Sequence, residues 1–256
     1  MKEKPEAAKS GSCLNCGTHV DGNYCSNCGQ KFQPTKLPLR LFIRDAVETL
    51  FNVDNRWLRT LKDLFLKPGK VTKEYIDGKR AQYLPPLRIY LSISIVYFLL
   101  IQITDSKEVF FIDFSGDDQD GMSAMGTVIQ YALFLLVPVF AWITQLFHLK
   151  RKAFYVEYLI FSLHIHTVWF VFLMIELFTV WLGGNFDENW VPTLALILSI
   201  PAQALTYIFL VIYTKKTFEQ KWVTAVFKSL GIMIFYMFAL VLVTAAYIFL
   251  IIPLFE

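Results

Sequence analysis

The chain has four cysteines, all within sixteen residues near its N-terminus, in two Cys-x-x-Cys-Gly hooks. Four thiolates at this spacing are typical of a zinc ribbon, in which they form a tetrahedron around one Zn²⁺. Four sulfur ligands leave no position for water, so the predicted role of the zinc is structural. The predicted ligands are Cys13, Cys16, Cys25 and Cys28.

The alternative for these cysteines is a pair of disulfides. Neighbouring cysteines within one hook pair awkwardly, and residues 1–10 are charged, without the apolar core of a signal peptide. Zinc is therefore the preferred interpretation. Because zinc thiolates must stay reduced, we expect the N-terminus to face the cytosol.

The rest of the chain is too apolar for one soluble domain, with 55% hydrophobic and 16% aromatic residues. Long apolar stretches, each able to cross a hydrocarbon core about 30 Å thick, predict an all-α polytopic membrane bundle of about five helices. The expected spans are residues 86–104, 123–147, 153–182, 190–213 and 223–253. The expected domains are a zinc ribbon (1–33), a linker with amphipathic juxtamembrane helices (34–85) and the transmembrane bundle (86–256).

The distribution of charge predicts the orientation of the bundle. Sixteen of the 24 Lys and Arg residues precede Leu91, which indicates that this side is cytosolic. The expected loops alternate between acidic or neutral and basic, the last basic one holding Lys215 and Lys216. The pattern predicts that the N-terminus lies in the cytosol and the C-terminus outside.

Between the ribbon and the first span, apolar residues recur at helical spacing with basic residues alongside, from residue 40 to 51 and from 56 to 66. Two interpretations stay open: the helices lie on anionic lipid, or they pack on the cytosolic ends of the spans. Nucleic acid is not an expected partner, because acidic residues interleave throughout.

The chain also resembles a known family. The cysteine hooks, followed by Leu66-Lys-Pro-Gly69, Glu74-Tyr-Ile-Asp-Gly78-Lys-Arg80, Tyr83-Leu-Pro-Pro86 and a membrane segment, resemble a bacterial family of zinc-ribbon membrane proteins, domain-of-unknown-function family 3667. The similarity covers roughly residues 13 to 104. It implies the architecture given above and a place in the bacterial inner (cytoplasmic) membrane, and it carries no activity.

The motif before the first span reads as a constrained turn that fixes how the chain enters the bilayer. Lys79, Arg80 and Arg88 are expected near lipid phosphates, either as general anchors or as a specific headgroup site.

Ionisable residues inside a span are costly and therefore candidates for function. The third span holds Glu157, His164 and His166. The two histidines should point about 200° apart on a regular helix, which disfavours a shared metal ion. The fourth span adds a polar stripe of Ser199, Gln203 and Thr206. Interhelical hydrogen bonding and a substrate or proton path are the competing interpretations.

No P-loop, dinucleotide-binding or hydrolase motif is present. The sequence therefore favours a non-enzymatic adaptor or regulator, with Zn²⁺ as cofactor and the bilayer, an anionic lipid and a cytosolic protein as partners. The alternatives are a transporter or channel that uses the polar residues of spans three and four, and a lipid-modifying enzyme that uses Glu157 and His164.

Overall fold

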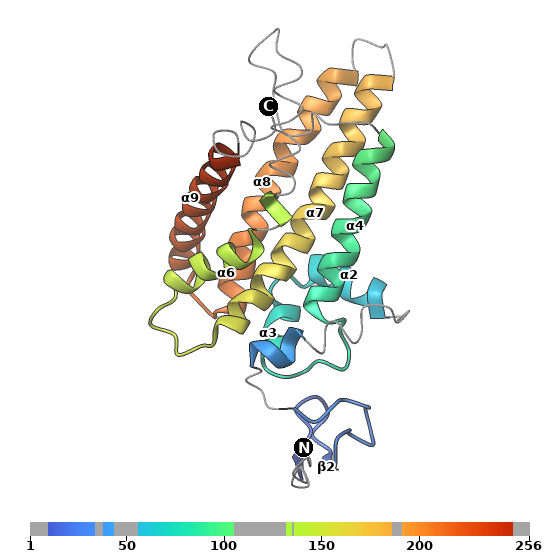
Figure 1. The fold of residues 1–256 in the computed structure, drawn as a ribbon, viewed down its shortest axis with the longest axis vertical. Helices are drawn as coiled ribbons and strands as arrows, with labels where there is room; N and C mark the ends of the chain where they lie inside the picture. The colour runs from blue at the N-terminus through green and yellow to red at the C-terminus, as the bar shows by residue number, and fades with distance from the viewer. Residues whose placement is uncertain are drawn as a thin grey trace.

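The computed structural model describes residues 10–33, 38–43, 56–104, 132–134, 136–185 and 191–247, except for the side chains of residues 180, 183–196, 198–200 and 202. A small ribbon lies at one end of a bundle of long, roughly aligned helices (Figure 1). The elements are β1 (Ser10–Ser12), β2 (His19–Asp21), α2 (Arg56–Leu66), α3 (Lys70–Ile76), α4 (Pro86–Thr104), α6 (Val137–Leu146), α7 (Tyr155–Asn185), α8 (Val191–Thr217) and α9 (Trp222–Ala246).

Three helices in the described part of the chain are long and apolar enough to cross a membrane: Pro86–Thr104, Tyr155–Thr179 and Trp222–Ala246. The first has the predicted bounds. The predicted span 123–147 is described only from residue 132, where α6 is a shorter apolar helix. The predicted span 190–213 is helical as α8, but many of its first side chains lie outside the described set. The count of five spans therefore stays a prediction.

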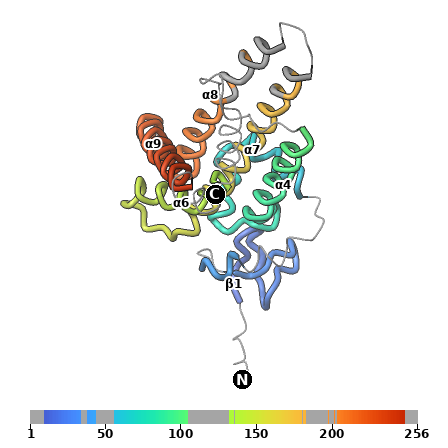
Figure 2. The backbone as a smooth tube through the Cα atoms, turned by 45° about the horizontal axis from the view of Figure 1, so that its top comes forward, coloured from blue at the N-terminus to red at the C-terminus, as the bar shows by residue number. Residues whose placement is uncertain are grey.

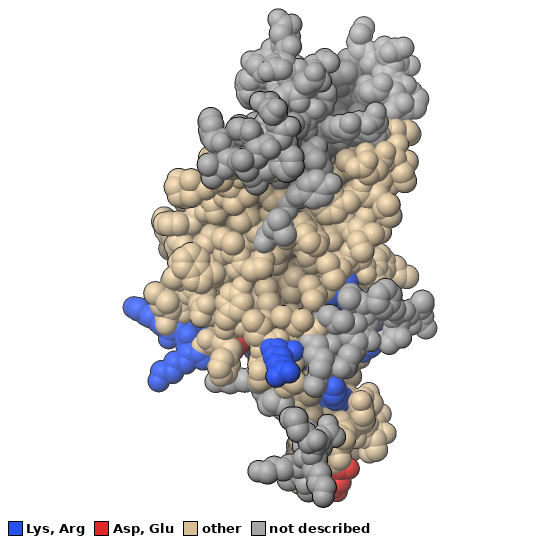
Figure 3. Space-filling model, viewed as in Figure 1, with Lys and Arg blue, Asp and Glu red and all other residues tan. Residues whose placement is uncertain are grey.

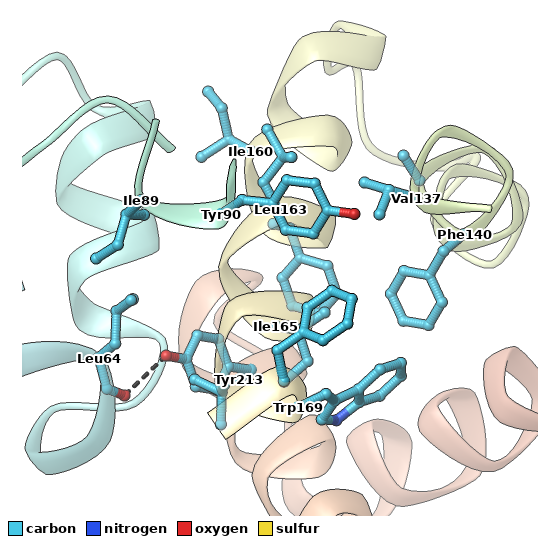
Figure 4. Close-up of a cluster of buried hydrophobic side chains, with 14 of the residues drawn as sticks. Leu64, Ile89, Tyr90, Val137, Phe140, Ile160, Leu163, Ile165, Trp169 and Tyr213 are labelled. Atoms are coloured by element: carbon cyan, nitrogen blue, oxygen red, sulfur yellow. Dashed lines mark hydrogen bonds between the residues drawn. The ribbon is translucent and has the colours of Figure 1, made fainter. Parts of the chain in front are cut away.

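Helix α7 is the centre of the bundle and packs against α4, α6 and α8. Every residue from 161 to 170 is buried, as expected of a helix surrounded by others. Phe140, Trp169 and Tyr213 are among the large side chains of this core (Figure 4). By contrast, α9 exposes large apolar side chains such as Phe227 and Val241, which suits contact with lipid.

The pre-span helix α3 packs into the bundle, which favours the second of the two interpretations for this segment. Val71 and Thr72 are fully buried. The hydroxyl of Tyr213 on α8 donates to the carbonyl oxygen of Leu64 at 2.7 Å (Figure 4), so the end of α2 is tied to α8. Helix α2 also keeps exposed apolar side chains, Leu58 and Leu66. The predicted helix at residues 40–51 is helical at 39–43 and otherwise lies outside the described residues.

Gly69 makes the close approach of α3 to α8 possible. Its φ is 76°, in the left-handed region that favours glycine. A Cβ atom here would lie 2.7 Å from Cβ of Lys216 and 3.2 Å from the carbonyl oxygen of Tyr213. The Pro-Gly of the motif therefore both ends α2 and lets the chain touch α8.

Candidate metal centre and the polar residues of the bundle

The ribbon places its two cysteine hooks in equivalent turns. In each, the glycine after the second cysteine donates its N–H to the carbonyl oxygen of the first: Gly17 to Cys13 at 2.8 Å, and Gly29 to Cys25 at 2.9 Å. Both glycines have positive φ, 76° and 70°. Strands β1 and β2 pair antiparallel beside the first hook, with Gly11 opposite Val20. Local backbone geometry thus aims the four thiols at one point.

The four sulfur atoms lie within 4.8 Å of one another and could hold one metal ion. Sγ of Cys13 lies 3.6 Å from Sγ of Cys28, and Sγ of Cys16 lies 3.5 Å from Sγ of Cys25. A tetrahedral zinc–thiolate site separates its sulfurs by roughly 3.8 Å, so the observed spacing fits such an ion. The close pairs each join one hook to the other, so the two hooks face each other across the site.

The second cysteine of each hook, Cys16 in the first and Cys28 in the second, has a different environment. Hydrogen bonds from the side chain and backbone of Thr18 lower the pKa of the Cys16 thiol to about 6. Burial raises the pKa of the Cys28 thiol to about 11. Cys16 therefore ionises more readily than Cys28, and a bound cation would favour the thiolate form of Cys28.

The ribbon is docked on the bundle, at the turn between α3 and α4 (Figure 2). The side-chain amide of Gln30 donates to the carbonyl oxygen of Gly78 at 2.8 Å. Its oxygen accepts from the backbone N–H groups of Arg80 and Ala81, both at 2.9 Å. A Cβ at Gly78 would lie 2.6 Å from Cδ1 of Leu14, so the ribbon touches this turn directly.

A cavity of about 350 Å³ separates the ribbon from α2 and the turn beside this contact. Arg56, which lines it, donates to the carbonyl oxygen of Ala81 at 2.7 Å. Tyr83 donates its hydroxyl to Glu74 at 2.5 Å, and burial together with this carboxylate raises the pKa of Tyr83. The motif residues 74–83 therefore fix the surface on which the ribbon sits.

His164 and His166 lie on different sides of α7 and contact different helices. His164 is hydrogen-bonded through Nδ1 to the Thr72 hydroxyl of α3 at 2.9 Å. His166 donates from Nδ1 to the carbonyl oxygen of Ser162 at 2.8 Å and accepts at Nε2 from the Tyr236 hydroxyl of α9 at 3.0 Å. Each histidine thus joins α7 to a neighbour, and the two share no partner among the described residues.

Gln203 on α8 and the backbone carbonyl of Thr206 form hydrogen bonds with residues other than His164. Gln203 donates to Glu176 Oε1 at 3.1 Å, near the end of the bundle away from the ribbon. The backbone carbonyl oxygen of Thr206 accepts a hydrogen bond from the indole N–H of Trp169 at 3.4 Å. The side chain of Ser199 lies outside the described set. The polar stripe of Ser199, Gln203 and Thr206 therefore stays a prediction.

Glu157 lies in the first turn of α7 and forms its hydrogen bonds with residues just before that helix. Its carboxylate accepts from Nη2 of Arg151 at 3.1 Å and from the backbone N–H of Phe154 at 3.3 Å. The geometry therefore does not pair Glu157 with His164, as a lipid-modifying enzyme would require.

The predicted headgroup residues differ in exposure. Lys79 is exposed. Arg80 donates from Nε to the carbonyl oxygen of Tyr75 at 3.4 Å and lies over its ring at 5.6 Å. Arg88 is only 7% exposed, which leaves little of it to reach a phosphate. Of the three, only Lys79 is exposed, and the headgroup role of these residues stays a prediction.

Sequence reasoning missed two residues that the structure makes central. Gln30 follows the second hook directly, but a single glutamine in a sequence does not indicate which residues it will hydrogen-bond. Thr72 was overlooked because it precedes the predicted membrane segment, whereas α3 packs beside α7. The Pro-Gly before α3 was the one available sign that this helix approaches another backbone closely.

The comparison with protein families matches residues 54–98 to a family described as protein of unknown function (DUF3667). The matched segment comprises α2, α3 and most of α4, with the turn that receives the ribbon. It does not include the cysteine hooks. No curated protein and no solved structure matches the chain.

Proposed function

We propose that the chain is a membrane-anchored adaptor, in which a zinc-bound ribbon recruits a cytosolic protein and the bundle holds that ribbon at the inner membrane. The observation that carries the proposal is the Gln30 contact. Three hydrogen bonds from one side chain fix the ribbon to the turn before α4. A ribbon held in this way presents a defined surface rather than swinging on its linker.

The predicted metal and orientation fit this role. The four sulfurs are spaced for one tetrahedral ion, and zinc with four thiolates is a structural centre without an open position. Lys and Arg gather at the ribbon end of the bundle, and the middle of the visible face has no charge among the described residues (Figure 3). This asymmetry favours the ribbon end as the cytosolic one.

The interior of the bundle supports an anchoring role more than transport. His166 is enclosed by Phe140, Trp169 and Tyr236. The cavity beside it holds about 20 Å³, enough for about one water, and its lining is apolar apart from this ring. The described residues around His166 therefore form packed helix contacts.

A photocrosslinking amino acid placed at Tyr24, which is 63% exposed on the ribbon, tests the proposal in cells that express the full chain. We expect a discrete protein adduct that disappears in the Cys25→Ser/Cys28→Ser variant and persists in Ser26→Ala, a control at a position between the two ligands in the sequence. The same label at Leu58, exposed on α2, should not give this adduct. An adduct unchanged by loss of the cysteines would contradict the proposal.

A further inference from the structure

A second cavity lies at the ribbon end of the bundle, away from the ribbon contact. It holds about 840 Å³ and forms where the segment after α6 meets the turn between α8 and α9. Its polar lining residues include His148, Lys150, Arg151, Gln220, Thr224 and Lys228. Its volume is within the range of small-molecule sites. Nothing in the adaptor role uses it.

The charge of this cavity is positive. Its one carboxylate, Glu219, lies 2.9 Å from Nζ of Lys73, outside the cavity. Arg151 pairs with Glu157 at 3.1 Å. Lys150 and Lys228 both line the cavity, and neither has an ion-pair partner in the described part of the chain. Two uncompensated ammonium groups at one cavity favour an anion.

Two of the residues that line the cavity each hold a buried acceptor that lacks a donor among the described residues. Nδ1 of His148 donates to the carbonyl oxygen of Thr144 at 2.7 Å, which places the proton of the neutral ring on Nδ1. Nε2 is then an acceptor, and it is buried without a partner among the described residues. Oε1 of Gln220 is likewise buried and unpartnered there. Buried acceptors of this kind are unfavourable unless a water or a ligand donates to them.

The turn that carries Gln220 is held in a strained form. Glu219 has a φ of 51°, a left-handed conformation that is costly for a residue other than glycine. The Lys73 contact and the ring of Phe218, 4.2 Å from that of His148, hold the turn in place. The acceptors are therefore part of a built arrangement and not of a loose surface.

We propose that this cavity binds a phosphate ester of a small polyol, of the glycerol phosphate type. The phosphate lies between Lys150 and Lys228, and the hydroxyl groups donate to Nε2 of His148 and Oε1 of Gln220. The ester has two sources: the headgroup of phosphatidylglycerol, or free glycerol phosphate. Two exposed apolar side chains that line the cavity, Leu146 and Leu149, would lie along the acyl chains of the lipid.

The purified full-length chain in nanodiscs of phosphatidylcholine containing phosphatidylglycerol or phosphatidic acid tests this, with retained lipid counted by native mass spectrometry. We expect phosphatidylglycerol to be retained at least tenfold over phosphatidylcholine, and several-fold over phosphatidic acid, which has the phosphate without the polyol. Lys150→Gln/Lys228→Gln should reduce this retention about tenfold. The matched control Lys62→Gln/Lys152→Gln removes two exposed lysines outside the cavity and should change it less than twofold.

His148→Phe removes the acceptor and keeps a ring beside Phe218, so it should abolish the preference for phosphatidylglycerol over phosphatidic acid. Titration with free glycerol 3-phosphate separates the sources: binding of this ester without lipid retention assigns the site to the soluble compound. If the lysine variant does not fold, retention by wild type is measured at high salt instead. Screening of the two lysines should then abolish the preference for phosphatidylglycerol over phosphatidylcholine. The proposal is overturned if neither ester binds, if the lysine variant binds normally, or if wild type retains both acidic lipids above phosphatidylcholine to the same extent.

Discussion

Gln30 of the ribbon donates a hydrogen bond to the carbonyl oxygen of Gly78 in the turn before α4, at 2.8 Å. Forty-eight residues separate the two along the chain. The same glutamine accepts from two further backbone N–H groups of that turn. One side chain thus uses both of its polar atoms to join the candidate metal centre to the segment that matches a family of unknown function.

Gly78→Ala should release the ribbon. The φ of Gly78 is 96°, and an added Cβ would lie 2.6 Å from Leu14. Gly22→Ala is the control, because Gly22 also has positive φ, 125°, with nothing within 4 Å of its Cβ position. We expect trypsin to cleave after Lys79 and Arg80 several-fold faster in Gly78→Ala alone. Equal cleavage in both variants would show that backbone strain, and not the contact with Leu14, determines the result.

Gly69→Ala should weaken the packing of α3 on α8. The substitution adds left-handed strain and a clash with backbone and Cβ atoms of α8, which together destabilise by about 1–3 kcal/mol. Gly17→Ala has the same φ of 76° and open space around its Cβ position, so it isolates the strain. Thermal unfolding in detergent should show the larger loss for Gly69→Ala. A loss no greater than in the control would contradict the close contact.

Thr72→Val should destabilise the bundle by about 1–3 kcal/mol, because it leaves Nδ1 of the buried His164 without its partner. Thr167→Val is the control on α7: its buried hydroxyl bonds only to the carbonyl oxygen of Leu163 in the same helix, at 2.7 Å. Chemical denaturation of both variants, each with and without His164→Phe, gives the coupling energy. Additive effects of Thr72→Val and His164→Phe would count against the interhelical bond.

His148 should make the protein less stable in acid. Burial, with smaller contributions from Lys228 and Arg151, lowers its pKa from 6.5 to about 4. The unfolded chain then binds more protons than the folded one between these values, so stability falls as pH drops from about 6.5 through 4, by about 3 kcal/mol in all. His148→Phe should remove that part of the dependence. Melting curves at pH 7 and pH 4 in lipid-free detergent measure it, and identical pH slopes would contradict the assignment.

Local features were predictable from the sequence, and long-range contacts were not. The spacing of the cysteines predicted their convergence, and apolar length predicted α4 with its bounds. The 200° separation of His164 and His166 also followed from helix geometry. Their partners did not, because helical periodicity defines a face and not the neighbour that covers it. Thr72 and Tyr236 come from segments 92 and 70 residues distant.

Hydrogen exchange at the backbone amides of Arg80 and Ala81, with and without metal, tests the central claim most directly. If a metal-bound ribbon is held on the bundle through Gln30, a chelator should unfold the ribbon and speed exchange at both amides, while exchange in α7 stays unchanged. Gln30→Ala should reproduce the fast exchange with metal still bound. Equal exchange at Arg80 and Ala81 with and without metal would contradict the account.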